Sequence, residues 1–197
     1  SLVGRIGQMN GLKELTLTSN GSQLKKHAKQ LFNSGVRRIN VSLDSLNAER
    51  FKSITRTGEL SQVLEGIDQA LEEGLKIKLN AVILRGRNED EVLDLVEFAR
   101  QKKIDISFIE EMPLGEVGYD RSVTFLSSAD IKEVIEEKYP LKASSYKTGG
   151  PAVYSSIEDQ KTRIGFISPH SNNFCSDCNR VRITAVGRLL LCLGNEN

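Results

Sequence analysis

The sequence has few cysteines, little net charge and no long apolar run, and each of these absences excludes a class of protein. Its 197 residues carry a formal net charge of +1, so no bulk electrostatic attraction to nucleic acid is expected. No apolar stretch approaches the roughly 20 residues that a membrane-spanning helix needs, so we expect no membrane partner. The three cysteines are an odd number, which argues against a disulfide framework and favours a reducing, cytoplasmic location.

The ends of the sequence differ from those of a typical complete chain. Residue 1 is Ser rather than Met, and an apolar helical pattern begins immediately after it. The last residue, Asn197, follows shortly after Cys192. We therefore expect a piece of a longer protein, although 197 residues are enough for one domain with an extensive core.

The three cysteines that are present lie close together near the C-terminal end. Cys175 and Cys178 form a C-x-x-C pair, and thirteen residues separate Cys178 from Cys192. Thiolates at this spacing bind Zn²⁺ or iron–sulfur clusters. A structural zinc site needs four ligands, for which His170 is the remaining candidate, whereas a cubane held by three cysteines leaves one iron free to bind a substrate. The spacing alone leaves a cluster, zinc and metal-free cysteines open.

Two arginines follow the C-x-x-C pair directly. Arg180 and Arg182 are two residues apart, so on a strand they share one face. The guanidinium group matches the oxygens of a phosphate or of another polyanion. Because the two arginines follow metal ligands directly, we consider a binding site for a polyanion at least as good an interpretation as a solvent-exposed edge strand.

The first two-thirds of the chain alternate between strand and helix patterns about 30 residues apart, which is the length of a βα unit. We expect strands at 12–17, 36–43, 75–84 and 104–111, and helices at 22–35, from 47 onward, at 60–73 and at 88–103. Ser22 and Asn88 are expected to cap the helices that follow them, and Asn47 to begin the second helix. Four such units predict a parallel sheet covered by helices.

The pattern changes after residue 113. A helix is expected from 127 to about 138, followed by strands at 153–157 and 162–167. A closed TIM barrel needs eight strands, and the chain supplies about four before the change. The sequence therefore predicts an α/β fold with an incomplete, truncated TIM-type barrel at 1–113. A C-terminal β-rich segment at 114–197 would carry the cysteine cluster.

Several residues near the carboxyl ends of the predicted strands are candidates for a ligand site, because ligands bind at that end of parallel sheets. Lys78 and Asn80 lie on the face of their strand opposite to the apolar residues, and a lysine there must point to water, a carboxylate or a ligand. Thr18 and Ser42 most simply satisfy loop backbones. Met112 most simply packs in the core.

The C-terminal motif and several strand ends together resemble a known family. Residues 165–193 read G-F-I-S-P-H-S-N-N-F-C-S-D-C-N-R-V-R-I-T-A-V-G-R-L-L-L-C-L. Further similar segments are L-T-S-N-G at 17–21, V-S-L-D at 41–44, K-L-N at 78–80, E-E-M-P at 110–113 and G-P-A-V-Y at 150–154. The chain is similar over its whole length to the molybdenum cofactor biosynthesis protein A family. These are the GTP 3',8-cyclases of the radical S-adenosylmethionine (radical SAM) superfamily.

The resemblance implies an enzyme with an incomplete barrel and two [4Fe-4S] clusters that converts GTP to (8S)-3',8-cyclo-7,8-dihydroguanosine 5'-triphosphate. It implies SAM as the source of a 5'-deoxyadenosyl radical that takes hydrogen from C3' of GTP, after which C3' attacks C8 of guanine. It also implies that cyclic pyranopterin monophosphate synthase acts on the product, and it allows a homodimer.

The resemblance also assigns roles to residues of this sequence wherever the motifs match. The C-terminal cluster would be ligated by Cys175, Cys178 and Cys192. GTP would be contacted by Thr18, Lys78, Arg180, Val181 and Arg182. SAM would be contacted by Ser42 and Met112.

One part of the family pattern is absent from the sequence. The C-x3-C-x2-C motif that holds the SAM-cleaving cluster does not occur in these 197 residues. The chain by itself is therefore expected to be inactive and to bind at most GTP and one cluster. Two alternatives are another radical SAM enzyme with an auxiliary cluster and a non-enzymatic zinc-binding module.

Overall fold

A computed structural model describes residues 1–112, 118–158, 161–172, 178 and 180–191. The N-terminal elements are α1 (Leu2–Gly7), β1 (Leu15–Ser19), α2 (Leu24–Asn33), β2 (Val36–Ser42), α3 (Ala48–Thr55), α4 (Leu60–Glu72) and β3 (Lys76–Val82). They are followed by the 3-10 helix η1 (Glu89–Glu91), α5 (Val92–Lys102), β4 (Asp105–Ile109), α6 (Arg121–Thr124) and α7 (Ser128–Glu136). The last strands are β5 (Lys142–Ala143), β6 (Val153–Ser156), β7 (Arg163–Ile167), β8 (Arg182–Ile183) and β9 (Leu189–Leu190).

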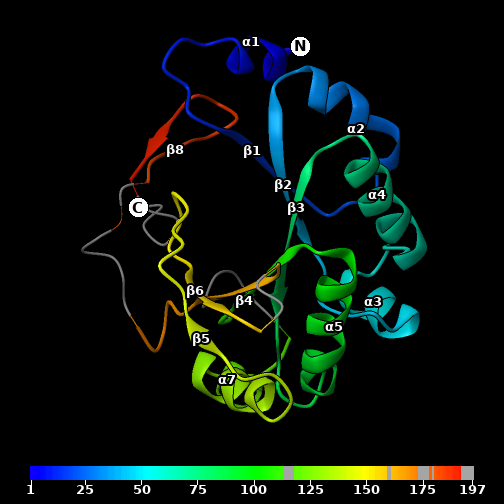
Figure 1. Cartoon of the computed structure of the whole chain (residues 1–197), viewed down its shortest axis with the longest axis vertical. Helices are drawn as coiled ribbons and strands as arrows, with labels where there is room; N and C mark the ends of the chain where they lie inside the picture. Colours follow the sequence, from blue (N-terminus) through cyan, green and yellow to red (C-terminus); the bar gives the residue numbers. More distant parts are fainter. Residues whose placement is uncertain (113–117, 159–160, 173–177, 179, 192–197) are drawn as a thin grey trace.

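The described strands form one large sheet and one small hairpin. The seven-stranded sheet has the order β1-β2-β3-β4-β7-β6-β5, and β8 pairs with β9. Strands β1 to β4 and β7 run parallel, whereas β6 and β5 are antiparallel to their neighbours. Figure 1 shows helices α2, α3, α4 and α5 along the outer side of the sheet. The expectation of a mixed α/β fold with a mostly parallel sheet is therefore confirmed.

The apolar core lies between the sheet and these helices. Alternate residues of the central strands, such as Ile39, Leu79 and Ile106, are fully buried on this side. They pack against buried helix residues such as Ile67 and Leu95. Because side chains alternate along a strand, the residues between them must face the opposite side of the sheet. None of the described helices is both long and apolar enough to cross a bilayer.

Two of the expected helix caps are wrong, and the structure shows why. The N-cap of α2 is Gln23 rather than Ser22, whose hydroxyl instead donates to the side chain of Asn20. Asn88 precedes η1 but makes no capping bond, because its side chain accepts from the amide of Leu84 and donates to the carbonyls of Asp44 and of Val82 at the end of β3. Asn47 does cap its helix, as expected.

A buried carboxylate at the end of β4 joins three distant parts of the chain. The side chain of Glu110, which is 1% exposed, accepts hydrogen bonds from the amide of Ser128 at the start of α7 and from the amides of His170 and Ser171. The hydroxyl of Ser171 also donates to it, at 2.5 Å. Glu110 therefore fixes the segment 168–172, which leads into the C-x-x-C pair, to the end of the parallel sheet.

The hydrogen bonds of Glu110 also determine how its carboxylate titrates. Burial alone raises the pKa of Glu110, but the bonds from Ser171, Ser128 and His170 outweigh burial and hold the pKa below its ordinary value of 4.5. The folded state thus binds the proton more weakly than the unfolded state. The stabilisation by this carboxylate is fully present above pH 4.5 and is lost as pH falls through the lowered folded pKa.

We predict that Glu110→Gln lowers the free energy of unfolding at pH 7 by about 3 kcal/mol, because the amide group cannot accept from every buried donor. Denaturant unfolding at pH 7 and at pH 4 measures the effect, which should shrink at the lower pH. Glu133→Gln on the exposed side of α7 is the matched control and should change little. Equal stability of both variants at pH 7 would contradict the role of Glu110.

Candidate functional site

The inner face of the sheet, opposite the helices, carries a row of polar side chains. The strand register places Thr18 beside Asn40, Asn40 beside Lys78, and Lys78 beside Asp105. The amide of Asn40 donates to the hydroxyl of Thr18 at 3.5 Å. Asp105 ends the row in a forked ion pair with Arg163. The structure therefore brings together two of the residues expected to contact GTP, Thr18 and Lys78, with Asn40 between them.

Lys78 is the unusual member of this row, because its side chain is buried on a polar face. Only 8% of the residue is exposed, and within the described part of the chain its ammonium group has no hydrogen-bond partner. Burial lowers the pKa of Lys78 to about 8, and the nearby charge of Arg38 lowers the pKa further while Asp105 opposes the shift. A buried ammonium group of this kind favours an anionic ligand.

A second row lies one register step closer to the carboxyl ends of the strands. Ser42 is beside Asn80, Asn80 is beside Ser107, and β7 and β6 continue the row through Gly165 to Tyr154. The side-chain oxygens of Asn80, Ser107 and Tyr154 are buried and have no hydrogen-bond partner among the described residues, and the same holds for Asn40 in the first row. Buried polar groups are normally hydrogen-bonded, so this concentration of unpartnered oxygens marks a place where a ligand could form hydrogen bonds.

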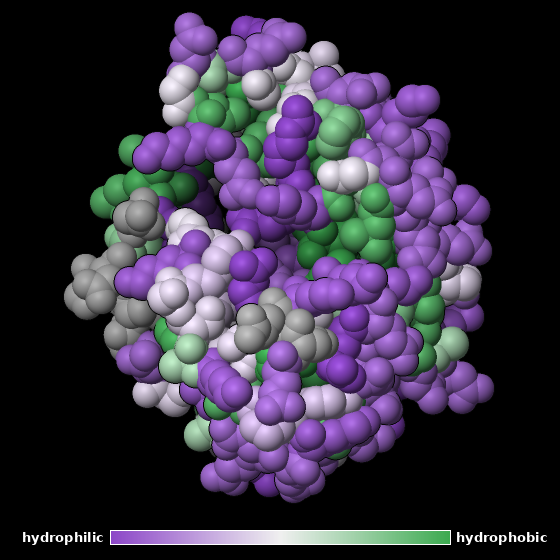
Figure 2. All heavy atoms as spheres, viewed as in Figure 1, coloured by the Kyte–Doolittle hydropathy of each residue, from purple (hydrophilic) through white to green (hydrophobic). Residues whose placement is uncertain are grey.

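Gly165 is the member of this row that allows its neighbours Ser107 and Tyr154 to approach each other. A Cβ atom at this position would lie 2.5 Å from Oγ of Ser107 and 3.0 Å from Cε1 of Tyr154. Both distances are shorter than ordinary van der Waals contact, so any other residue would push the two side chains apart. Figure 2 shows hydrophilic residues gathered around a hollow at the centre of this side of the molecule.

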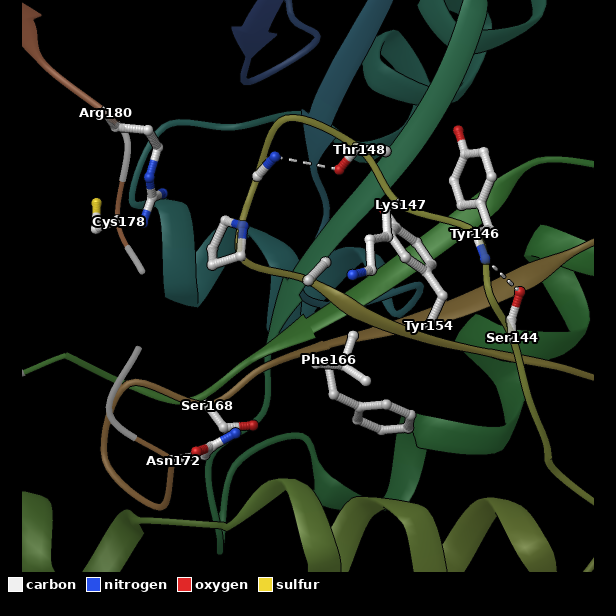
Figure 3. Close-up of a pocket in the computed structure, with 14 residues that line it drawn as sticks. Ser144, Tyr146, Lys147, Thr148, Tyr154, Phe166, Ser168, Asn172, Cys178 and Arg180 are labelled. Carbon is white, nitrogen blue, oxygen red and sulfur yellow. Dashed lines mark hydrogen bonds between the residues drawn. The ribbon is translucent and has the colours of Figure 1, made fainter. Parts of the chain in front are cut away.

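A pocket of about 360 Å³ lies between the segment 144–154 and the residues around the second cysteine (Figure 3). The described residues that line it are Ser144, Tyr146, Lys147, Thr148, Gly150, Pro151, Ala152, Val153, Tyr154, Phe166, Ser168, Asn172, Cys178 and Arg180. Tyr154 belongs both to this pocket and to the second polar row. The two regions that the sequence singled out separately, the strand ends and the cysteine segment, are therefore connected along the sheet.

Cys178 is the cysteine that the structure describes, and its thiol is exposed at the pocket. Hydrogen bonds from the backbone and side chain of Arg180 lower the pKa of Cys178, and they outweigh the opposing effect of burial. The charges of Arg180 and Arg182 lower the pKa further. A lowered pKa favours the thiolate, which is the form that binds iron and zinc. The surroundings of Cys178 thus suit a metal ligand.

Four predicted site residues remain, namely Arg182, Val181, Met112 and Ser42. Arg182 begins the β8–β9 hairpin, and Val181 just before it is 61% exposed. Met112 is 36% exposed, so the interpretation that it packs in the core is wrong. Its predicted contact with SAM stays a prediction, as does that of Ser42 at the end of β2.

Two of the three predicted cluster ligands, Cys175 and Cys192, lie outside the described residues. Among the residues that are described, no group of three His, Cys, Asp or Glu side chains could hold a metal ion. That finding does not bear on a site that needs both of these cysteines. The three-cysteine ligand set therefore stays a prediction.

The sequence analysis missed several residues that shape the site. Asn40 and Ser107 occupy alternate positions of β2 and β4, so the same alternation that singled out Lys78 could have identified them. Tyr154 and Lys147 carried no such signal, because their place in the pocket depends on the pairing of β6 with β7.

Two family models match the chain in succession. Residues 2–99 match the radical SAM superfamily, and residues 104–197 match the family described as Molybdenum Cofactor Synthesis C. A solved structure of TcdA (CsdL) is 9% identical and covers 96% of this chain and 79% of that chain, with a TM-score of 0.26. That score is too low to indicate a shared fold.

Curated relatives are similar over essentially the whole chain. GTP 3',8-cyclase 2 of Pseudomonas aeruginosa is 55% identical over 99% of this chain, and GTP 3',8-cyclase of Marinobacter nauticus is 53% identical over 100% of it. GTP 3',8-cyclase of Pseudomonas entomophila is 56% identical, also over 100% of the chain. The chain spans 60% of the length of each of these three relatives. The chain is therefore similar over essentially its whole length to part of these GTP 3',8-cyclases, with a radical SAM match in its first half and a molybdenum cofactor synthesis match in its second.

Proposed function

We propose that the chain carries the GTP-binding part of a GTP 3',8-cyclase, an enzyme of molybdenum cofactor biosynthesis that uses radical SAM chemistry. The observation that carries this proposal is the buried residue Lys78, whose ammonium group has no hydrogen-bond partner in the described part of the chain. Asn40 beside it and Asn80 two residues along the same strand both have unpartnered side-chain oxygens. A nucleotide supplies both the phosphate oxygens that a lysine binds and the donors that amide oxygens accept.

The other GTP contacts follow the family motif. Thr18 lies in the same row as Lys78, and Arg180 lines the pocket beside Cys178. Val181 and Arg182 follow directly in the chain, and Arg182 adds positive charge near Cys178. We further propose that Ser42 and Met112 contact SAM, which would place SAM at the carboxyl ends of β2 and β4.

We propose that Cys175, Cys178 and Cys192 hold a [4Fe-4S] cluster. The chemistry of the described ligand fits this group, because the exposed thiol of Cys178 has a lowered pKa and opens onto the pocket. When bound, a cluster with three cysteine ligands supplies one iron that is open to the guanine base. The chain's own residues would bind and orient the nucleotide beside it.

The remaining features of the proposal concern the architecture and the partners. Residues 1–113 would form an incomplete TIM-type barrel and residues 114–197 the cluster-bearing segment, which the polar inner face of the parallel sheet supports. The cyclised product would pass to cyclic pyranopterin monophosphate synthase. A homodimer and a cytoplasmic location are also part of the proposal.

We predict that Lys78→Gln raises the Kd for GTP about 10-fold to 100-fold, the cost of losing one charge-assisted hydrogen bond. Calorimetric titration of the anaerobically reconstituted chain measures this. Lys76→Gln is the matched control, because Lys76 lies two residues earlier on the same strand and is exposed. Equal Kd values for both variants and the wild type would remove Lys78 from the site.

The lowered pKa of Lys78 predicts how GTP affinity changes with pH. Bound phosphate favours the charged lysine, whereas the free protein loses that charge above pH 8. The affinity should therefore fall about five-fold between pH 8 and pH 9 in the wild type beyond the change in Lys78→Gln. Comparison with the variant subtracts the titration of the nucleotide itself. Identical pH profiles would show that Lys78 does not titrate with binding.

We predict that anaerobic reconstitution gives about four irons and four sulfides per chain, as one cubane requires, with broad absorbance near 400 nm. Cys178→Ala should lose most of this iron and sulfide, because a ligand is removed. Metal analysis and labile-sulfide assay of both proteins measure the outcome. Stoichiometric zinc without labile sulfide would instead support the zinc-binding module.

We also predict that the reconstituted 197-residue chain forms no cyclised nucleotide and no 5'-deoxyadenosine from GTP, SAM and a reductant. Its sequence holds three cysteines in all, and none belongs to a C-x3-C-x2-C motif. Chromatography of the reaction mixture measures both products. Formation of either one would mean that SAM cleavage does not need that motif here.

A further inference from the structure

The pocket beside Cys178 has a second wall to which neither the family motif nor the relatives' names assign a role. This wall is the segment 144–154, and the side chain of Lys147 reaches from it into the pocket (Figure 3). Within the part of the chain that the structure describes, Lys147 makes no hydrogen bond and no ion pair. Its charge is therefore available to a ligand in the pocket.

The charges around the pocket favour an anion. The described lining residues include two cations, Lys147 and Arg180, and no Asp or Glu. The hydroxyl groups of Ser144, Thr148 and Ser168 also line the pocket. The two cations lie on opposite walls, and the Cys178 thiol that Arg180 contacts can offset only one of them, so the described lining residues still suit a group with several negative oxygens.

The wall that carries Lys147 is anchored to the sheet by a chain of contacts. The ring of Tyr146 packs edge-on against Tyr154, with the ring centroids 5.1 Å apart. The guanidinium group of Arg163 lies 3.5 Å from the centroid of Tyr146 and forms the forked ion pair with Asp105 of the first polar row. These contacts hold the backbone of Tyr146, so the next residue is presented from a fixed position.

One residue that lines the pocket also carries an unpartnered polar group. Tyr154 is 2% exposed, lines the pocket, and its buried hydroxyl has no hydrogen-bond partner among the described residues. A buried hydroxyl without a partner indicates that a ligand or water completes this wall. It is a feature of the site that does not depend on the charge of Lys147.

We propose that Lys147 binds the phosphate groups of the nucleotide from the wall opposite Arg180. This assignment rests on the proposed function for the identity of the nucleotide, and on the pocket itself for the anionic ligand. Lys147 is then a determinant of specificity that favours GTP over nucleosides and lower phosphates. Its contribution is to binding, because it contacts the phosphate end and not the reacting carbons.

The test compares GTP, guanosine and inorganic triphosphate as ligands of the reconstituted chain. In Lys147→Gln we expect the Kd for GTP and for triphosphate to rise about tenfold, while the Kd for guanosine is unchanged. Lys147→Arg should keep most of the affinity. Lys142→Gln is the matched control, because Lys142 is, like Lys147, an exposed lysine, but it lies in the preceding strand β5 and does not line the pocket.

The outcomes separate this assignment from the proposed function. If wild type binds GTP and Lys147→Gln behaves as Lys142→Gln does, the assignment is wrong and the proposed function stands. An equal loss for guanosine and GTP also overturns it, since the phosphates would then not be involved. If wild type binds triphosphate through Lys147 but binds GTP no better than triphosphate and does not bind guanosine, the proposed function fails and the anion site stands.

Discussion

The alternation of side chains along parallel strands in register is the constraint on which the whole site depends. Helices cover one face of β1 to β4 and bury its apolar residues, so every second residue is committed to the other face. The register then aligns these residues into two polar rows. A slip of one residue in β3 would turn Lys78 and Asn80 into the apolar core. The packing that stabilises the sheet therefore also positions the side chains expected to bind the nucleotide.

The polar rows and the cysteine segment are joined by two features at β4 and β7. Glu110 at the end of β4 holds the segment that leads into the C-x-x-C pair, and Gly165 in β7 lets Ser107 and Tyr154 approach across the sheet. Neither residue is a candidate ligand of GTP or of a cluster. They fix how far the polar rows lie from the cysteine segment. The proposed nucleotide would bind between these two regions.

The sequence predicted the parts of the fold that rest on local patterns. The alternation in 75–84 identified β3 and the exceptional position of Lys78. Asn47 begins its helix as expected, and the helix expected from 127 is α7, with Ser127 as its N-cap. The caps at Ser22 and Asn88 were wrong, because the side chains of these residues bind other partners. The network of Glu110 was not predictable, since its partners at 170 and 171 lie 60 and 61 residues away. Spacing alone also left the metal at the cysteines undecided.

The pairing of β4 with β7 has a consequence for how the protein reaches this state. Asp105 and Arg163, which meet at this pairing, are 58 residues apart in the chain, whereas β1 to β4 join through successive neighbours. Closing so long a loop costs more entropy than joining adjacent units, so β7 is expected to dock after the first four strands have assembled. Until β7 docks, the pocket beside Cys178 is not formed. Only the fully folded chain is therefore expected to bind the nucleotide, and partly folded intermediates are expected not to bind it.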